Sequence, residues 1–158
     1  MSDASTQPQP ATATPDLSGV HLWLVLWKAY RAVEARDRES IRRLGFACLS
    51  DFGVLEVLLH KGPQTVSAIG AAVDLTSGSA TSAVKRAEAK GYVRRVPSPE
   101  DGRSVLIGLT PTGRKVIRKA FDQHAAYLES VFDGLDPDER AALLRLLKKA
   151  GRGAAGSA

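Results

Sequence analysis

The sequence predicts a mainly α-helical protein with one small β-hairpin. Two helix-favouring runs follow each other closely at residues 67–73 and 77–90, and the second begins with small hydroxyl side chains. Two β-rich runs at residues 92–96 and 105–109 come next, on either side of a loop of proline, glycine and charged residues. This order of elements is typical of a winged helix-turn-helix, in which the hairpin is a small β-wing.

A long helix is predicted before this core, at about residues 16–46. Trp23, Trp27 and Tyr30 recur at i, i+4 and i+7, so they share one face of that helix. A second helical segment is predicted after the core, at about residues 111–150. Both segments carry more apolar surface than one small domain needs, so we expect them to be N- and C-terminal dimerisation helices.

Local signals place the elements between these helices. Ser50 is expected to cap a helix over residues 51–60, which Gly62 and Pro63 end. Residues 64–66 could form a short strand against the wing, and Ser67 could cap the third helix.

The later helices have stronger start and stop signals. Thr76 is expected to cap the fourth helix, which Gly91 ends. Thr110 followed by proline predicts the start of the fifth helix. Residues 136–139 predict a capping box for the sixth. That helix carries Leu143, Leu144, Leu146 and Leu147.

These elements fit one domain with a tail at each end. Residues 1–15 are small, polar and proline-rich, which predicts disorder. Residues 16–150 form the predicted domain, with the winged helix-turn-helix at about residues 50–110. Residues 151–158 are small and predict a flexible tail.

Charge is concentrated in the winged part. The chain of 158 residues has a formal net charge of +5. Residues 65–118 hold nine basic and four acidic side chains, so this segment accounts for the whole excess. A localised basic surface favours a polyanion partner such as double-stranded DNA. Charge alone would fit a merely soluble basic surface equally well.

Several other classes of protein are disfavoured. The single cysteine suits a reducing cytoplasm, and neither a membrane span nor a secretory signal is visible. The three histidines, His21, His60 and His124, are scattered, so no metal site is expected. No phosphate loop or catalytic constellation is present, which predicts a protein that is not an enzyme and needs no cofactor.

The predicted second helix of the helix-turn-helix carries the candidate DNA contacts. Its hydroxyl and basic side chains could face bases and phosphates, although they could also form an ordinary solvated face. Ala80, Ala83 and Val84 are expected on the buried side. The candidates are Ser77, Ser79, Thr81, Ser82, Lys85 and Arg86.

The wing supplies a second group of candidates. Arg103 lies near the tip of the hairpin loop, where an arginine can enter a narrow minor groove. Asp101 could stabilise the wing through an ion pair with it. Arg94 and Arg95 alternate on a strand, so at most one should face phosphate, and Arg94 is the candidate.

Aromatic residues before and within the second helix could line a ligand pocket. The alternative is ordinary core or dimer packing, which is the more common role of an aromatic stripe. The candidate ligand-binding residues are Trp23, Trp27, Tyr30, Phe46, Asp51 and Phe52.

Cys48 is a candidate redox sensor. A reactive thiol needs exposure and a nearby cation. Its sequence neighbours Ala47 and Leu49 are apolar, and the only cations nearby in sequence are Arg42 and Arg43, so the sequence favours inert burial over redox sensing.

The sequence over about residues 20–151 resembles the MarR family of bacterial transcriptional regulators. The similarity is carried by residues 58–63 (LLHKGP), by TSGS at 76–79 with KRAEAKG at 85–91, and by PEDGR at 99–103 with Leu109 and Thr110. Residues 50–56 (SDFGVLE) are similar to the branch that senses quinones and phenolic compounds. Gly102 and Ala87 depart from the family pattern, which usually has arginine and leucine there.

The resemblance implies a homodimeric regulator, usually a repressor, that binds a pseudo-palindromic operator. A small aromatic or phenolic ligand, or oxidation of Cys48, would release the DNA. A winged-helix module for protein partners is the rival from another class, but the basic recognition helix and wing favour DNA.

Overall fold

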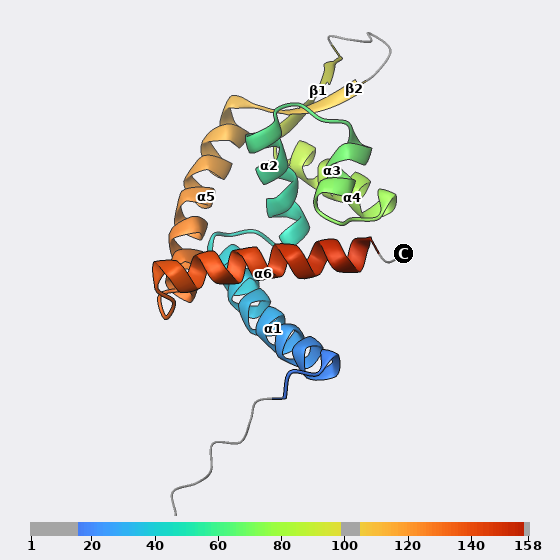
Figure 1. The fold of residues 1–158 in the computed structure, drawn as a ribbon. Coiled ribbons are helices and arrows are strands. Elements are labelled where there is room, and N and C mark those ends of the chain that lie inside the picture. Colours follow the sequence, from blue (N-terminus) through green and yellow to red (C-terminus); the bar gives the residue numbers. More distant parts are fainter. Residues whose placement is uncertain (1–15, 99–104, 157–158) are drawn as a thin grey trace, which may run out of the picture. The chain divides into compact units, whose positions relative to one another are not determined.

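The computed structural model describes residues 16–98 and 105–156 (Figure 1). It divides into two compact units, one ending at Ala32 and the other beginning at Val33. Helix α1 (Gly19–Arg43) runs through the boundary, so its first part belongs to one unit and its last part to the other. This long helix was predicted. The two units are described separately below, and residues 1–15, a predicted tail, lie outside the described residues.

The first unit holds an exposed apolar helix. Trp23, Trp27 and Tyr30 are 61%, 43% and 59% exposed. The Arg31 guanidinium lies 5.6 Å from the centre of the Trp27 ring. Leu22, Leu24 and other large apolar residues of this segment are also exposed. A helix that is apolar on all sides is normally covered by other protein.

The second unit contains the last part of α1 and the remaining elements. They follow in the order α2 (Leu49–Lys61), α3 (Val66–Ala72), α4 (Ser77–Ala89), β1 (Val93–Pro97), β2 (Val105–Leu109), α5 (Pro111–Val131) and α6 (Pro137–Ala155). The mainly α fold with one β-hairpin is therefore confirmed.

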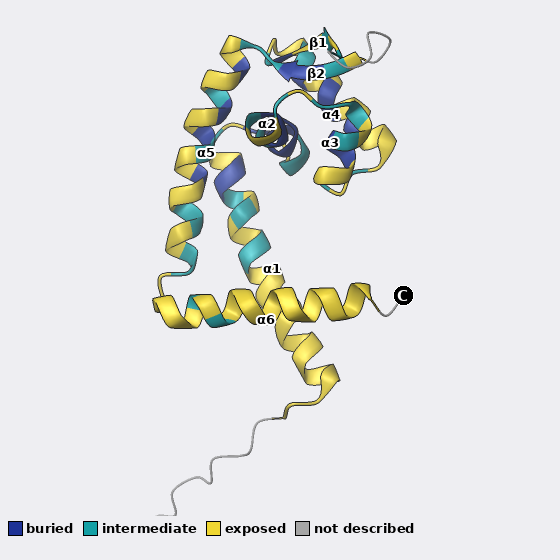
Figure 2. Cartoon of the chain, turned by 45° about the horizontal axis from the view of Figure 1, so that its top comes forward, coloured by how far each residue is buried: buried dark blue, intermediate teal, exposed yellow. Residues whose placement is uncertain are grey.

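Helix α2 lies at the centre of this unit (Figure 2). It packs against α3, α4, α5 and β2. Its inward side chains include Phe52, Leu55 and Leu58, each at most 2% exposed. The other helices and the hairpin complete the core with Ile69, Val84, Ile107 and Ile117.

The two strands form an antiparallel hairpin. Their register runs from Val93 opposite Leu109 to Pro97 opposite Val105. Gln64 adds a single bridge to Ile107, with N–O distances of 3.0 and 2.8 Å. The short strand predicted at residues 64–66 is thus reduced to Gln64, because Val66 already begins α3.

Capping residues agree with the prediction at three helices and differ at two. Thr76, Thr110 and Asp136 accept hydrogen bonds at the starts of α4, α5 and α6, and Asp136 forms the predicted capping box with Glu139. The correction at α3 is that Thr65, not Ser67, is the capping residue: its hydroxyl accepts a hydrogen bond from the backbone N–H of Ala68.

The correction at α2 concerns Ser50. The extended N-cap residue is Cys48, so Ser50 already lies in the first turn of the helix. The Cys48 side chain makes no capping hydrogen bond. The hydroxyl of Ser50 instead contacts the Cys48 thiol and accepts from Arg86.

Helix α6 continues to Ala155, so the tail predicted at residues 151–158 is wrong for its first five residues. Alanines and a strong start signal favour continuation of the helix through Gly151 and Gly153. Arg140 anchors the start of α6, donating to the carbonyls of Leu135 and Phe132. No described residue of α6 is buried, and its leucines are exposed.

A buried histidine joins the last part of α1 to α5. His124 is 5% exposed. Its Nδ1 lies 3.0 Å from Ser40 Oγ, and its Nε2 lies 3.1 Å from Asp37 Oδ1. Sequence reasoning missed this network, since the histidine is far along the chain from the other two residues. Each ring nitrogen therefore has a polar partner, which lowers the cost of burying the imidazole.

Gly113 is required by a close backbone approach. A Cβ at this position would lie 1.9 Å from the carbonyl oxygen of Tyr92. We expect Gly113→Ala to destabilise the fold by about 1–3 kcal/mol, because α5 must move away from the hairpin. Urea unfolding followed by circular dichroism measures the change.

Gly151→Ala is the matched control. A Cβ there meets nothing within 4 Å, so this variant should be as stable as the parent or slightly more stable. Equal stability of Gly113→Ala and the parent would contradict the close approach.

Candidate nucleic-acid interface

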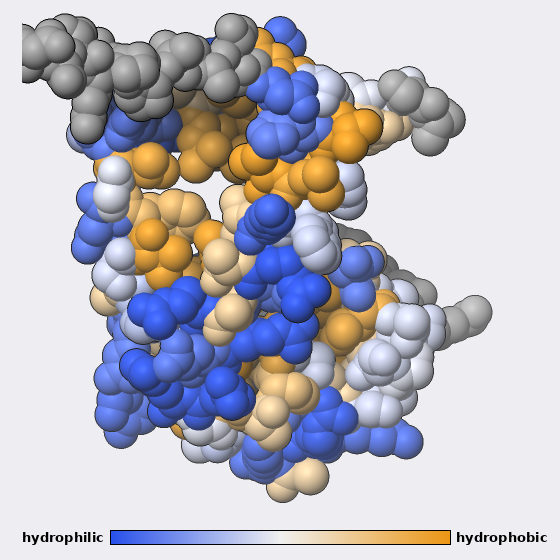
Figure 3. Space-filling model, turned by 90° about the horizontal axis from the view of Figure 1, so that it is seen from below, coloured by the Kyte–Doolittle hydropathy of each residue, from blue (hydrophilic) through white to orange (hydrophobic). Residues whose placement is uncertain are grey.

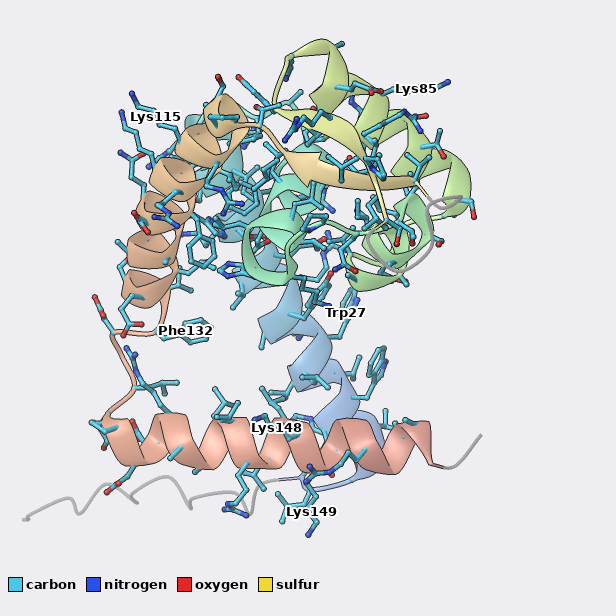
Figure 4. All side chains as sticks on the ribbon, turned by 90° about the horizontal axis from the view of Figure 1, so that it is seen from above. Trp27, Lys85, Lys115, Phe132, Lys148 and Lys149 are labelled. Atoms are coloured by element: carbon cyan, nitrogen blue, oxygen red, sulfur yellow. The ribbon has the colours of Figure 1, made fainter. Side chains whose placement is uncertain are left out.

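Helix α4 presents a polar face to solvent and a small-residue face to the core. Ala80, Ala83, Val84 and Ala87 are buried, as predicted for the first three. Their small size lets α4 pack against α2 and α3. The candidate DNA contacts Ser77, Ser79, Thr81, Ser82, Lys85 and Arg86 are all exposed. In Figure 4, Lys85 points away from the body of the unit.

Arg86 is held by an acidic residue from α2. Its Nε and Nη2 lie 2.8 and 2.7 Å from Asp51 Oδ1. The Asp51 side chain is 7% exposed and that of Arg86 is 45% exposed. The hydrogen bond with Asp51 is the largest cause that raises the pKa of Arg86. The pair therefore fixes the last turn of α4 to the start of α2.

Sequence reasoning assigned these two residues to different sites, Asp51 to a ligand pocket and Arg86 to DNA. A signal for the pair was present. Asp51 directly precedes the apolar run of α2, and a carboxylate that is buried with such a helix needs a cationic partner.

The Cys48 thiol lies beside the same arginine. The residue is exposed. Its Sγ is 3.1 Å from Ser50 Oγ and 3.7 Å from Arg86 Nη2. The prediction of inert burial is therefore wrong, because the end of α1 leaves this N-cap position at the surface. The neighbouring cation comes from α4 and was invisible in the local sequence.

An open, polar hollow lies between the starts of α2 and α4. Its volume is about 430 Å³. It is lined by hydroxyl groups, one glycine and the guanidinium of Arg86. The lining residues are Ser50, Thr76, Gly78, Ser79, Ser82 and Arg86. A hollow of this composition can hold an anion through charge-assisted hydrogen bonds.

The hairpin contributes exposed cations. Arg94 and Arg95 are both exposed on β1. Arg95 Nε lies 3.5 Å from Glu88 Oε1, whereas the described residues provide no ion-pair partner for Arg94. Arg103 and Asp101, the candidates at the wing tip, lie outside the described residues.

The candidate ligand-binding residues are divided between the two units. Phe46 and Phe52 are buried, and their rings make an edge contact with centres 5.3 Å apart. Phe46 and Asp51 border a cavity of about 10 Å³, which is room for one water molecule and not for an organic ligand. Trp23, Trp27 and Tyr30 belong to the other unit. The aromatic pocket stays a prediction.

A larger hollow lies between the end of α1 and the start of α2. Its volume is about 440 Å³, within the range of small-molecule sites. The lining is apolar apart from two arginines and the thiol. It consists of Ala35, Arg38, Ile41, Arg42, Ala47, Cys48 and Leu49.

Within residues 16–98 and 105–156, no group of three or more histidine, cysteine or acidic residues could hold a metal ion. None of the helices there is long and apolar enough to span a membrane.

Comparisons with known proteins agree with this surface. The model of the MarR family matches residues 49–104. The transcriptional regulator YkoM of Bacillus subtilis is 36% identical over 132 residues, which are 84% of this chain and 85% of that protein.

Solved structures agree as well. The chain is similar to Bordetella bronchiseptica BpsR, with a TM-score of 0.69 and 27% identity over 85% of this chain and 94% of that one. It is also similar to a mutant of Escherichia coli MarR in complex with operator DNA. There the TM-score is 0.71, with 25% identity over 86% and 99% of the two chains. The chain therefore belongs to the MarR family of DNA-binding transcriptional regulators.

Proposed function

We propose that this regulator is a homodimeric repressor that leaves a pseudo-palindromic operator when a small aromatic ligand binds. The observation that carries the DNA-binding part is the exposed face of α4, where hydroxyl groups and Lys85 are presented by a helix whose opposite side is buried. A helix of this kind fits the major groove. A cytoplasmic location, where the operator would be, belongs to the same proposal.

The proposed DNA contacts keep their predicted roles. In this proposal Lys85 and the hydroxyl side chains of α4 contact base edges and phosphates. Arg94 contacts the phosphate backbone, and Arg103 enters the minor groove. The basic character of these residues favours DNA over a protein partner. An acidic or apolar recognition face would have favoured the winged-helix interaction module.

Two apolar surfaces support the homodimer. The first unit exposes Trp23, Trp27 and their neighbours, and α6 exposes Leu143, Leu144, Leu146 and Leu147 at 38–56%. Figure 3 shows orange apolar groups among blue hydrophilic ones on one face. Apolar surface of this extent is usually covered by another chain. A second copy of this protein also supplies the second recognition helix.

We expect Leu143→Glu combined with Leu147→Glu to yield a monomer. The two positions are one helical turn apart on α6, so the charges would share one face. Light scattering should give the mass of one 16.8 kDa chain instead of two.

Arg145→Gln combined with Lys149→Gln is the control, with the same spacing on the same helix. It should remain dimeric. A folded, dimeric Leu143→Glu/Leu147→Glu variant would remove α6 from the proposed interface.

The ligand part of the proposal is supported by a relative. The structural work on BpsR concerns regulation of its DNA binding by 6-hydroxynicotinic acid. In this chain the hollow between the end of α1 and the start of α2 offers a volume of about 440 Å³ for a one-ring compound. Oxidation of Cys48 is the second candidate trigger, favoured by its exposed thiol near Arg86.

A titration with phenolic acids and quinones distinguishes the two triggers. We expect operator affinity to fall at least tenfold, which requires about 1.4 kcal/mol of coupling. Cys48→Ser should respond in the same way. Release of DNA only by mild peroxide, abolished in Cys48→Ser and reversed by reductant, would instead assign the switch to the thiol.

A further inference from the structure

The ion pair between Asp51 and Arg86 leaves part of the arginine available. Asp51 is almost completely buried, and its Oδ2 has no hydrogen-bond partner among the described residues. The contacts to Asp51, Ser50 and Cys48 use Nε and Nη2 of Arg86. Among the described residues, Nη1 makes no hydrogen bond, and nearly half of the side chain is exposed. The guanidinium is thus anchored on one edge and open on the other.

Arg86 borders the polar hollow described above. Ser79 and Ser82 of α4 and Ser50 of α2 border it together with Arg86. Serine hydroxyls and arginine are common donors to the phosphate oxygens of DNA. An arginine that reads guanine usually presents two parallel N–H groups. Here the Nε–Nη2 edge is occupied by Asp51, so a phosphate oxygen is the better-matched acceptor.

The position of Arg86 along α4 points the same way. Recognition helices contact base edges mainly with residues near their N-terminal end. Arg86 lies in the last turn of α4 and is tied to the start of α2. A residue at this end of the helix borders the groove, where the backbone runs.

We propose that Arg86 binds a backbone phosphate of double-stranded DNA and that Asp51 is the residue that positions its guanidinium. This inference rests on the proposed DNA-binding face of α4. It changes the predicted role of Asp51 from ligand binding to the positioning of a DNA contact. It also makes the contact independent of base sequence.

The proposal predicts a change opposite to that of simple electrostatics. Asp51→Asn makes the protein one charge more positive, which by itself would strengthen DNA binding. Loss of positioning should weaken it instead, because the freed guanidinium is no longer held beside the hollow. The sign of the change therefore separates the two effects.

The experiment measures anisotropy of a labelled duplex of mixed sequence, about three helical turns long, across a range of salt concentrations. Because the contact is to the backbone, the operator need not be known. We expect Arg86→Gln and Asp51→Asn each to weaken binding about tenfold at low salt. Each should also make the negative slope of log affinity against log salt shallower by about one, because one phosphate contact is lost. The double variant should be no weaker than Arg86→Gln.

Two controls are matched in charge. Lys115→Gln removes one positive charge from α5, on the side of the unit away from Lys85 in Figure 4, and should bind within about twofold of the parent. Asp74→Asn neutralises an exposed acid in the turn before α4, where asparagine tolerates the positive φ of 52°, and should bind equally well or more tightly. Urea unfolding verifies that each variant is folded.

Arg86→Lys covers the case in which Asp51→Asn does not fold. It keeps the charge but cannot keep the two-nitrogen contact to Asp51, so affinity should fall by about threefold or more. Unchanged affinity and slope in Arg86→Lys, or tighter binding by folded Asp51→Asn, would overturn the positioning role. Failure of the parent protein to bind the duplex at low salt would overturn the proposed DNA-binding face itself.

Discussion

Burial of α2 on almost every side is the constraint on which the rest of the second unit depends. Its residues 51–55 are all buried, and Gly53 lets the side chain of Val73 approach the helix closely. A helix with almost no solvent face must be surrounded, so α3, α4, α5 and the hairpin are arranged around it. The position of the recognition helix α4 is therefore set mainly by apolar packing.

Two buried polar contacts add orientation to this packing. Asp51 holds Arg86 at the end of α4, and His124 holds Asp37 and Ser40 at the end of α1. Breaking one member of such a contact leaves a buried polar group without a partner, which costs more than the intact contact contributes. These two contacts connect α2 to the DNA-binding face and α5 to the last part of α1.

Much of the fold could be predicted because its signals are local. Thr76, Thr110 and Asp136 mark helix starts by their own side chains, and the hairpin follows from two β-rich runs. Local signals did not place every cap. The N-cap positions predicted at Ser50 and Ser67 are held instead by Cys48 and Thr65, two residues earlier in each case. The need of Asp51 for a cationic partner has a local signal in the apolar run of α2, but the identity of that partner does not. Arg86 reaches Asp51 and Cys48 through contacts across 35 or more residues, which no local pattern contains.

The location of the thiol and the acid relative to α4 has a consequence for regulation. Cys48, Ser50 and Asp51 all lie at the start of α2 and all contact Arg86 or its neighbours. The hollow of about 440 Å³ includes Cys48 in its lining. A molecule bound there would lie beside Cys48, which itself contacts Arg86 of α4. A ligand affects DNA binding only through a difference in affinity between two geometries. In this chain the start of α2 is where such a difference could act on the DNA-binding face, because Cys48 borders the hollow and also contacts Arg86.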